Sequence, residues 1–174
     1  MKTIKLSQPQ IGFREKYGVL RVLNSGNLAQ GKKVQEFENL FSRLHDDLHC
    51  IAVNSGTSAL HLSLLALGIK AGDEILVPSF SFAASANAIS LTGATPVFCD
   101  IDTRTFNILA SDVEKKINQR TRAILVVHLY GLPANMTELT NIAEKNNLLL
   151  VEDAAQAHLT ARRKGPAHPR RAAG

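Results

Sequence analysis

Short apolar runs alternate with longer amphipathic segments along the chain from Cys50 onward. The runs are rich in valine, leucine, isoleucine and alanine, which is typical of strands buried on both faces of a parallel sheet. In the segments between them, apolar residues recur at helical spacing. We therefore expect strands at residues 51–53, 75–77, 96–100, 123–128 and 148–151. We expect helices between them at residues 57–67, 82–91, 112–118 and 135–146.

This alternation predicts an α/β fold with three α/β/α layers, in which helices cover both faces of a mostly parallel sheet. Signals at the helix ends support these limits. Gly68 and Gly93 follow two of the predicted helices, and glycine commonly ends a helix. Ser111-x-x-Glu114 has the spacing of a capping box for the helix at 112–118. Asn135 can cap the last helix, with Glu138 three residues later as its partner.

The first 49 residues have a different pattern. Residues 18–31 have the composition of a loop, whereas residues 34–44 predict an amphipathic helix. The inner face of that helix contains the apolar residues Val34, Phe37, Leu40, Phe41 and Leu44. We therefore divide the chain into an N-terminal arm and helix (1–49), a sheet domain (50–158) and a C-terminal tail (159–174).

Composition places the chain among globular proteins. A hydrophobic content of 45% in 174 residues is sufficient for one domain with a sizeable core. No apolar run reaches the length of a bilayer span, and the first residues lack the apolar block of a signal peptide. We therefore expect a cytoplasmic protein without a membrane partner. Cys50 and Cys99 lack the paired spacing of a zinc or disulfide site, so we expect no metal and no disulfide.

The net charge of +5 comes from the tail. Residues 159–174 contain no acid and carry the basic residues Arg162, Arg163, Lys164, Arg170 and Arg171. Residues 1–158 have 15 basic and 15 acidic side chains, so we expect no specific nucleic-acid partner. The tail has no apolar period and predicts a disordered basic end. Out-of-frame translation, a natural truncation or a remnant gene would each produce this pattern.

Residues that suit ligand binding follow the predicted strands at 51–53, 75–77 and 148–151. Asn54-Ser55-Gly56-Thr57-Ser58 opens a helix, where free backbone N–H groups and hydroxyls suit a phosphate, although Ser and Thr also act there as ordinary caps. In Pro78-Ser79-Phe80-Ser81-Phe82, an aromatic ring can stack on a planar ligand or belong to the core. Asp153 is placed to pair with a protonated ring nitrogen, or to cap a helix.

These motifs occur in the order phosphate loop, aromatic and aspartate, and in this order the chain resembles the DegT/DnrJ/EryC1/StrS family of sugar aminotransferases. These are pyridoxal-phosphate enzymes of fold-type I, the aspartate aminotransferase-like class. The resemblance extends over about residues 13–158. It rests on the segments 31–38, 53–60, 72–82, 93–102, 127–133 and 151–157.

The resemblance implies a role for each matching residue. Gly56, Thr57 and Ser58 would hold the phosphate of pyridoxal 5'-phosphate. Phe82 would stack on its pyridine ring, Asp153 would pair with the ring nitrogen, and Gln156 would reach the oxygen side of the ring. We expect His128 and Tyr130 to serve packing or an interface, and His61 and His158 to lie on the surface or in the core.

The resemblance also implies a Schiff-base lysine, because transamination needs an amine that bonds to the cofactor and moves protons. In the family this lysine follows the aspartate in a later block that begins Phe-Ser-Phe or similar. We find no such block here and assign no catalytic residue. We therefore expect a large domain that is truncated before the small C-terminal domain, that is poorly soluble, and that has no turnover alone.

The sequence leaves three functions open. The intact protein would transfer an amino group from an amino-acid donor to a keto-sugar nucleotide, for polysaccharide or antibiotic sugars, and would form a homodimer. Some relatives are similar to sugar dehydratases in which a histidine replaces the lysine. The third alternative is a non-catalytic remnant or dimerisation module.

Overall fold

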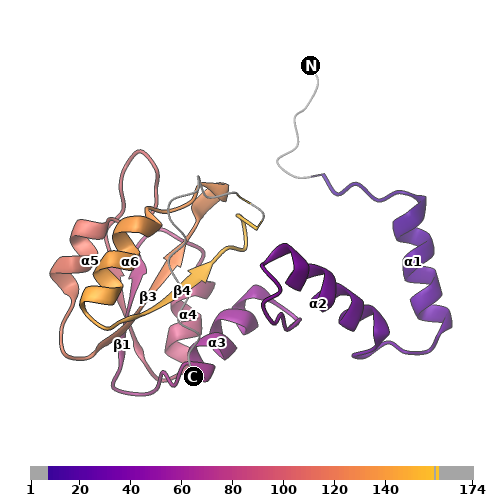
Figure 1. Ribbon diagram of the computed structural model, residues 1–174, viewed down its shortest axis with the longest axis horizontal. Helices are drawn as coiled ribbons and strands as arrows, with labels where there is room; N and C mark the ends of the chain where they lie inside the picture. The colour runs from indigo at the N-terminus through magenta and orange to yellow at the C-terminus, as the bar shows by residue number, and fades with distance from the viewer. Residues whose placement is uncertain (1–7, 159, 161–174) are drawn as a thin grey trace. The chain divides into compact units, whose positions relative to one another are not determined.

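The computed structural model describes residues 8–158 and 160. The chain divides into two compact units, Met1–Ala52 and Val53–Gly174 (Figure 1). None of the described helices combines the length and the apolar character that crossing a bilayer requires.

The second unit is built on a four-stranded parallel sheet with the strand order β2-β1-β3-β4. The strands are β1 (Glu74–Pro78), β2 (Thr95–Cys99), β3 (Thr121–Val127) and β4 (Leu149–Asp153). Each lies within two residues of a predicted strand, and the parallel α/β class is confirmed. The strand expected at 51–53 is wrong. Ile51 is 81% exposed and has no place in the sheet, because a three-residue apolar run is too short to indicate pairing.

Helices cover both faces of this sheet, as Figure 1 shows. Helices α3 (Gly56–Ala66) and α4 (Ala84–Leu91) share one apolar cluster with Leu125 and Val151. Helices α5 (Ala110–Lys116) and α6 (Met136–Lys145) share the opposite cluster with Ile124 and Val126. Successive strand residues thus point to opposite helical layers. Both faces are buried, which explains why the strands are continuously apolar.

The helix ends are set partly as predicted. Gly68 and Gly93 have φ values of +80° and +84°, and they end α3 and α4 in the left-handed conformation that glycine tolerates. Asn135 caps α6 by accepting a hydrogen bond from the backbone N–H of Glu138 at 3.5 Å.

The capping box predicted for α5 is wrong. The helix begins at Ala110 after Leu109, so Ser111 lies inside its first turn. Asp112 instead accepts from the backbone N–H of Asp100 at 2.7 Å and pairs with Lys116 at 2.8 Å. The Lys116 ammonium also donates to the carbonyl of Phe98 at 2.7 Å. Contacts with a distant strand, which local spacing does not reveal, therefore fix α5 against the end of β2.

The first unit contains α1 (Phe13–Asn24) and α2 (Lys32–Leu44). Helix α2 confirms the predicted amphipathic helix, with Phe37 and Phe41 5.7 Å apart between ring centroids. Helix α1 contradicts the expected loop over residues 18–24, whereas residues 25–31 connect the two helices as expected. Gly18 lies inside the helix, because a single glycine lowers helix propensity by only about 1 kcal/mol. No residue of either helix is fully buried in the described structure.

Candidate cofactor site at the carboxyl edge of the sheet

The parallel strands bring their carboxyl ends to one edge of the sheet. Val127 at the end of β3 pairs with Asp153 at the end of β4, and Pro78 at the end of β1 pairs with Cys99. Helix α3 runs antiparallel to the strands, because it ends at Ala66 shortly before β1 begins at Glu74. Its N-terminus therefore points to the same edge, where ligands bind in open α/β sheets.

Asp153 ends β4 and is held on the α3/α4 side of the sheet. Its Oδ2 accepts a hydrogen bond from Ser85 Oγ of α4 at 3.1 Å, and its Oδ1 accepts from the backbone N–H of Ala155 at 3.2 Å. Ser85 is only 1% exposed. Since its single hydroxyl proton goes to Asp153, the 3.1 Å contact between Ser81 Oγ and Ser85 Oγ is donated by Ser81. Ser81 therefore donates to Ser85, and Ser85 donates to the carboxylate of Asp153.

Ser85 was not among the residues that the sequence predicted for the cofactor site. A serine inside a mostly apolar helix has no motif of its own. Its one signal is position, because it lies three and four residues before Ala88 and Ile89, which are buried on the same face.

Glu152, the neighbour of Asp153, points to the opposite side of the sheet. Its Oε2 lies 2.9 Å from His128 Nε2. His128 is buried, and its Nδ1 accepts from the backbone N–H of Ala134 at 3.1 Å. The ring proton therefore lies on Nε2, which donates to Glu152. The acidic pair is thus divided, and only Asp153 is on the side of α3 and α4.

The loop before α3 combines a helix cap with open backbone. Ser55 Oγ accepts from the backbone N–H of Ser58 at 3.1 Å and lies 2.9 Å from Ser58 Oγ. The first N–H groups of a helix have no partner within the helix, which leaves those of Gly56 and Thr57 for a ligand. A Cβ built on Gly56 meets no atom within 4 Å. Packing inside the chain therefore does not require glycine here, whereas close approach of a ligand to the backbone favours it.

Phe82 is 78% exposed, so it is not part of the core that the described residues form. It precedes α4, and its carbonyl accepts from the backbone N–H of Ser85 at 3.1 Å. Phe82 is therefore linked through Ser85 to Asp153. The neighbouring Phe80 behaves differently, because its ring packs on Phe106 at a centroid distance of 5.8 Å.

Gln156 lies on the loop after β4 and contacts the loop after β3. Its Oε1 accepts from the backbone N–H of Tyr130 at 2.7 Å. Tyr130 belongs to the short 3-10 turn η1 (Leu129–Gly131), and its side chain is exposed. Of the residues selected from the sequence, Phe82 and Asp153 are thus joined through Ser85, while Gln156 is held by the adjacent turn.

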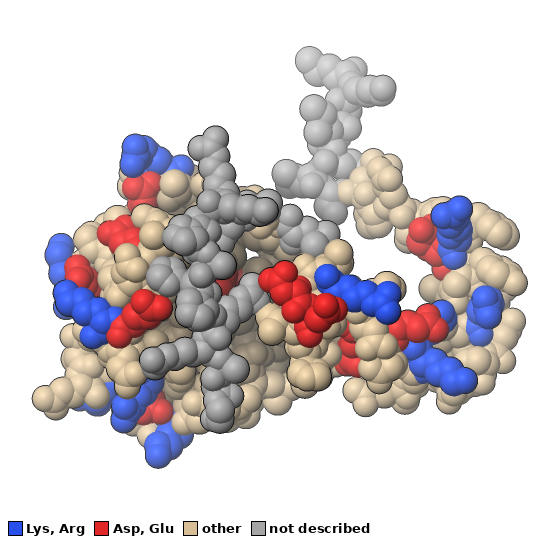
Figure 2. Space-filling model, viewed as in Figure 1, with Lys and Arg blue, Asp and Glu red and all other residues tan. Residues whose placement is uncertain are grey.

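Charged side chains of both signs are interspersed on the face drawn in Figure 2. The described lysines are exposed, apart from Lys116, which is half-buried and paired with Asp112. Lys2, Lys5 and Lys164 fall outside the described residues, as does nearly all of the tail at 159–174. No group of three or more His, Cys, Asp or Glu side chains suited to a metal is found in the described part of the chain.

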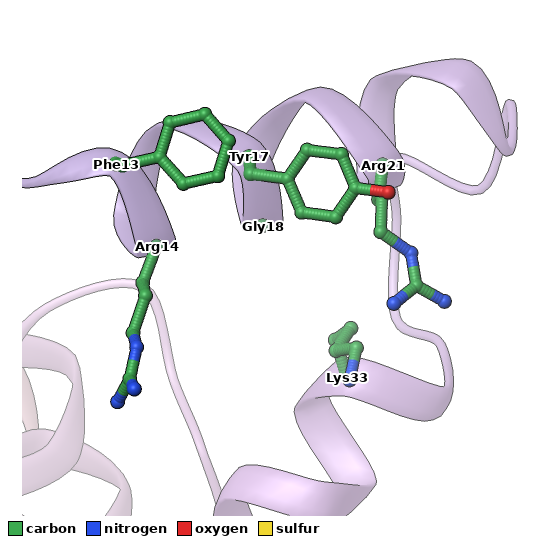
Figure 3. A pocket seen from close by; sticks show the side chains of 6 residues that line it. All are labelled: Phe13, Arg14, Tyr17, Gly18, Arg21 and Lys33. Atoms are coloured by element: carbon green, nitrogen blue, oxygen red, sulfur yellow. The ribbon is translucent and has the colours of Figure 1, made fainter.

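A separate hollow lies in the first unit, between α1 and the start of α2 (Figure 3). Its lining combines basic side chains with two aromatic rings that stack at 5.9 Å. The lining residues are Phe13, Arg14, Tyr17, Gly18, Arg21 and Lys33. None of them is among the residues selected for the cofactor.

Comparison with known proteins agrees with the family resemblance of the sequence. A model of the DegT/DnrJ/EryC1/StrS aminotransferase family matches residues 9–171. The chain is 44% identical over 158 residues to GDP-perosamine synthase of Escherichia coli O157:H7, covering 90% of this chain and 43% of that protein. It is 45% identical to the crystal structure of DesV from S. venezuelae, with a TM-score of 0.80 over 82% of this chain and 38% of DesV. NtdA from Bacillus subtilis, solved with bound cofactor PMP, is 38% identical with a TM-score of 0.79, over 82% of this chain and 33% of NtdA. The chain spans less than half the length of these proteins.

Proposed function

Because the chain belongs to the DegT/DnrJ/EryC1/StrS aminotransferase family, we propose that its sheet unit binds pyridoxal phosphate or its amino form, pyridoxamine phosphate (PMP). The whole protein would transfer an amino group from an amino acid to a keto-sugar nucleotide, as a cytoplasmic homodimer. The similarity to GDP-perosamine synthase supports a nucleotide-sugar substrate. The bound PMP of NtdA supports the cofactor.

One observation carries the proposal. Ser85 joins the carboxylate of Asp153 to the segment that presents Phe82, through hydrogen bonds of 3.1 Å on each side. A carboxylate and an exposed aromatic ring are thus linked at the edge to which the open N-terminus of α3 points. These groups suit three chemical parts of the cofactor. The helix N-terminus suits its anionic phosphate, the aromatic ring suits its flat ring, and the carboxylate suits its protonated ring nitrogen.

Each residue would have a distinct task. The backbone N–H groups of Gly56 and Thr57 would hold the phosphate, and Ser58 would contribute its hydroxyl. Phe82 would cover one face of the pyridine ring. Asp153 would keep the ring nitrogen protonated, and Gln156 would donate to the ring oxygen. When bound, the cofactor supplies an electron sink for chemistry at the amino carbon.

We further propose that this chain binds the cofactor without turning over by itself. A Schiff base needs a lysine amine beside the cofactor. Among the described lysines of the sheet unit, Lys70, Lys115 and Lys145 are exposed, and Lys116 is committed to Asp112 and to the carbonyl of Phe98. The family description supports transamination over the dehydratase alternative for the whole protein.

The test is a titration of the full chain with PMP, in which the absorbance and fluorescence of the PMP ring report binding. We expect saturable binding that Asp153→Asn weakens about 10- to 100-fold, because a hydrogen bond to a charged group contributes about 1.5–3 kcal/mol. Asp100→Asn is the matched control, since Asp100 follows β2 at the same edge of the sheet. Equal affinities for the two variants would refute the assignment of Asp153. Absence of saturable binding by the unaltered chain would refute cofactor binding.

A further inference from the structure

The turn after β3 has an unusual backbone. Tyr130 has φ +53° and ψ +24°, and Gly131 has φ +84°. Two consecutive residues in the left-handed region are costly when one of them carries a side chain. Tyr130 is 73% exposed, so burial of its side chain does not offset this cost. Contacts made by the backbone of the turn must hold it instead.

Asn107 provides two of these contacts. It is 4% exposed, and its side-chain amide reaches both ends of the turn. Its Oδ1 accepts from the backbone N–H of Leu129 at 3.1 Å, and its Nδ2 donates to the carbonyl of Leu132 at 3.0 Å. A buried amide with both ends satisfied is a rigid clamp, because breaking either bond leaves a buried polar atom unpaired.

The clamped turn lies directly against the segment that carries Gln156. A Cβ added to Gly131 would approach the backbone oxygen of Gln156 to 3.1 Å, so the position has little room for a side chain. In this conformation the N–H of Tyr130 donates to Gln156 Oε1 at 2.7 Å. An amide side chain has one acceptor end and one donor end. With its oxygen engaged by Tyr130, Gln156 presents its NH₂ group as the other end.

We propose that Asn107 and the turn of Leu129–Gly131 act as a positioning device that fixes Gln156 as a hydrogen-bond donor to the ring oxygen of the cofactor. The inference rests on the proposed function, because the ring oxygen belongs to pyridoxal phosphate. Asn107 does not touch the ring in this arrangement. It acts through the backbone of the turn, whose left-handed conformation aims the N–H of Tyr130 at Gln156.

The first test needs no cofactor. Amide hydrogen exchange by NMR reports whether the N–H of Tyr130 is protected. We expect protection in the unaltered chain and in Gln156→Glu, which keeps an acceptor oxygen. We expect exchange about tenfold faster in Gln156→Ala and in Asn107→Ala, each of which removes a hydrogen bond that holds the turn. Asn146→Ala is the matched control, since Asn146 also uses its Nδ2 on a backbone carbonyl, that of Ile142 at 2.8 Å.

The second test uses PMP. Gln156→Glu keeps the turn in place but removes the NH₂ group that would donate to the ring oxygen. Asn107→Ala keeps this NH₂ group but removes the hydrogen bonds that hold the turn, so Gln156 is no longer fixed. Both should weaken PMP binding about tenfold and shift the absorption band of the bound ring, which follows the ionisation of the ring oxygen. Asn146→Ala should change neither quantity. A merely structural role of Asn107 would lower stability without moving the band.

The outcomes separate this inference from the proposed function. An unprotected Tyr130 amide in the unaltered chain overturns the positioning device whatever PMP does. PMP binding by the unaltered chain, with the same affinity and band in Asn107→Ala as in Asn146→Ala, also overturns it and leaves the proposed function intact. Failure of the unaltered chain to bind PMP overturns the proposed function and, with it, the role of Gln156 toward the ring.

Discussion

The hydroxyl of Ser85 donates to the carboxylate of Asp153 across 3.1 Å, although the two residues are 68 positions apart. The bond joins α4 to the end of β4, and it ties the segment of Phe82 to the aspartate. The candidate site therefore depends on Ser85, a residue that belongs to no recognisable sequence motif.

Replacing Ser85 by alanine should affect both stability and ligand binding. The substitution leaves Asp153 Oδ2 without this donor and Ser81 without its acceptor. We expect the free energy of unfolding to fall by about 1–3 kcal/mol and PMP affinity to fall several-fold. Urea denaturation and PMP titration measure the two effects. Ser90→Ala in the same helix is the control, because Ser90 is exposed and its hydroxyl bonds only to the carbonyl of Ala86 among the contacts described. Equal effects of the two substitutions would contradict the assignment.

Replacing Phe82 by alanine should separate binding from stability. The ring is largely exposed, so its removal should change the free energy of unfolding by no more than about 0.5 kcal/mol. The loss of a stacking surface should weaken PMP binding clearly. Phe98→Ala is the control, since this ring is also exposed but lies on β2. A large loss of stability with unchanged PMP binding would show that Phe82 serves packing.

The carboxylate of Glu74 should make stability sensitive to acid. Hydrogen bonds from the side chains of Asn118 and Arg120 lower its pKa below the ordinary value of 4.5. A carboxylate whose pKa is lowered by folding stabilises the protein above the unfolded-state pKa, and this contribution is lost as pH falls through the folded-state pKa. Glu74→Gln should therefore flatten the decline in stability below pH 4.5. Urea denaturation at several pH values, with Glu114→Gln as the surface control, measures the change. An unaltered acid limb in Glu74→Gln would disprove the contribution.

The two cysteines should differ in reactivity. Burial raises the pKa of the Cys99 thiol to about 11, whereas Cys50 is only half-buried. The thiolate is the reactive form, so a thiol reagent at pH 8 should label Cys50 and spare Cys99. Mass spectrometry before and after denaturation identifies the labelled residue. Rapid labelling of Cys99 in the folded chain would mean that β2 opens readily.

The order of strands and helices in the second unit was predictable from the sequence. Residues 123–127, for example, are apolar at every position, and only a strand covered on both faces buries all of them. Asn135 and Gly93 marked helix ends because their preferences act within a few residues. The candidate residues Gly56, Phe82 and Asp153 were likewise recognisable, since each follows or opens an element in a family motif.

What only the tertiary structure decided depends on groups far apart in the sequence. Glu152 and Asp153 are neighbours in the sequence, yet the alternation of a strand sends one to His128 and the other to Ser85. Asn107 clamps a turn 22 to 25 positions later, and that turn orients Gln156. Local preference determined which elements form. Hydrogen bonds between distant segments determined which side chains those elements hold in place, because only the packed sheet brings donor and acceptor together.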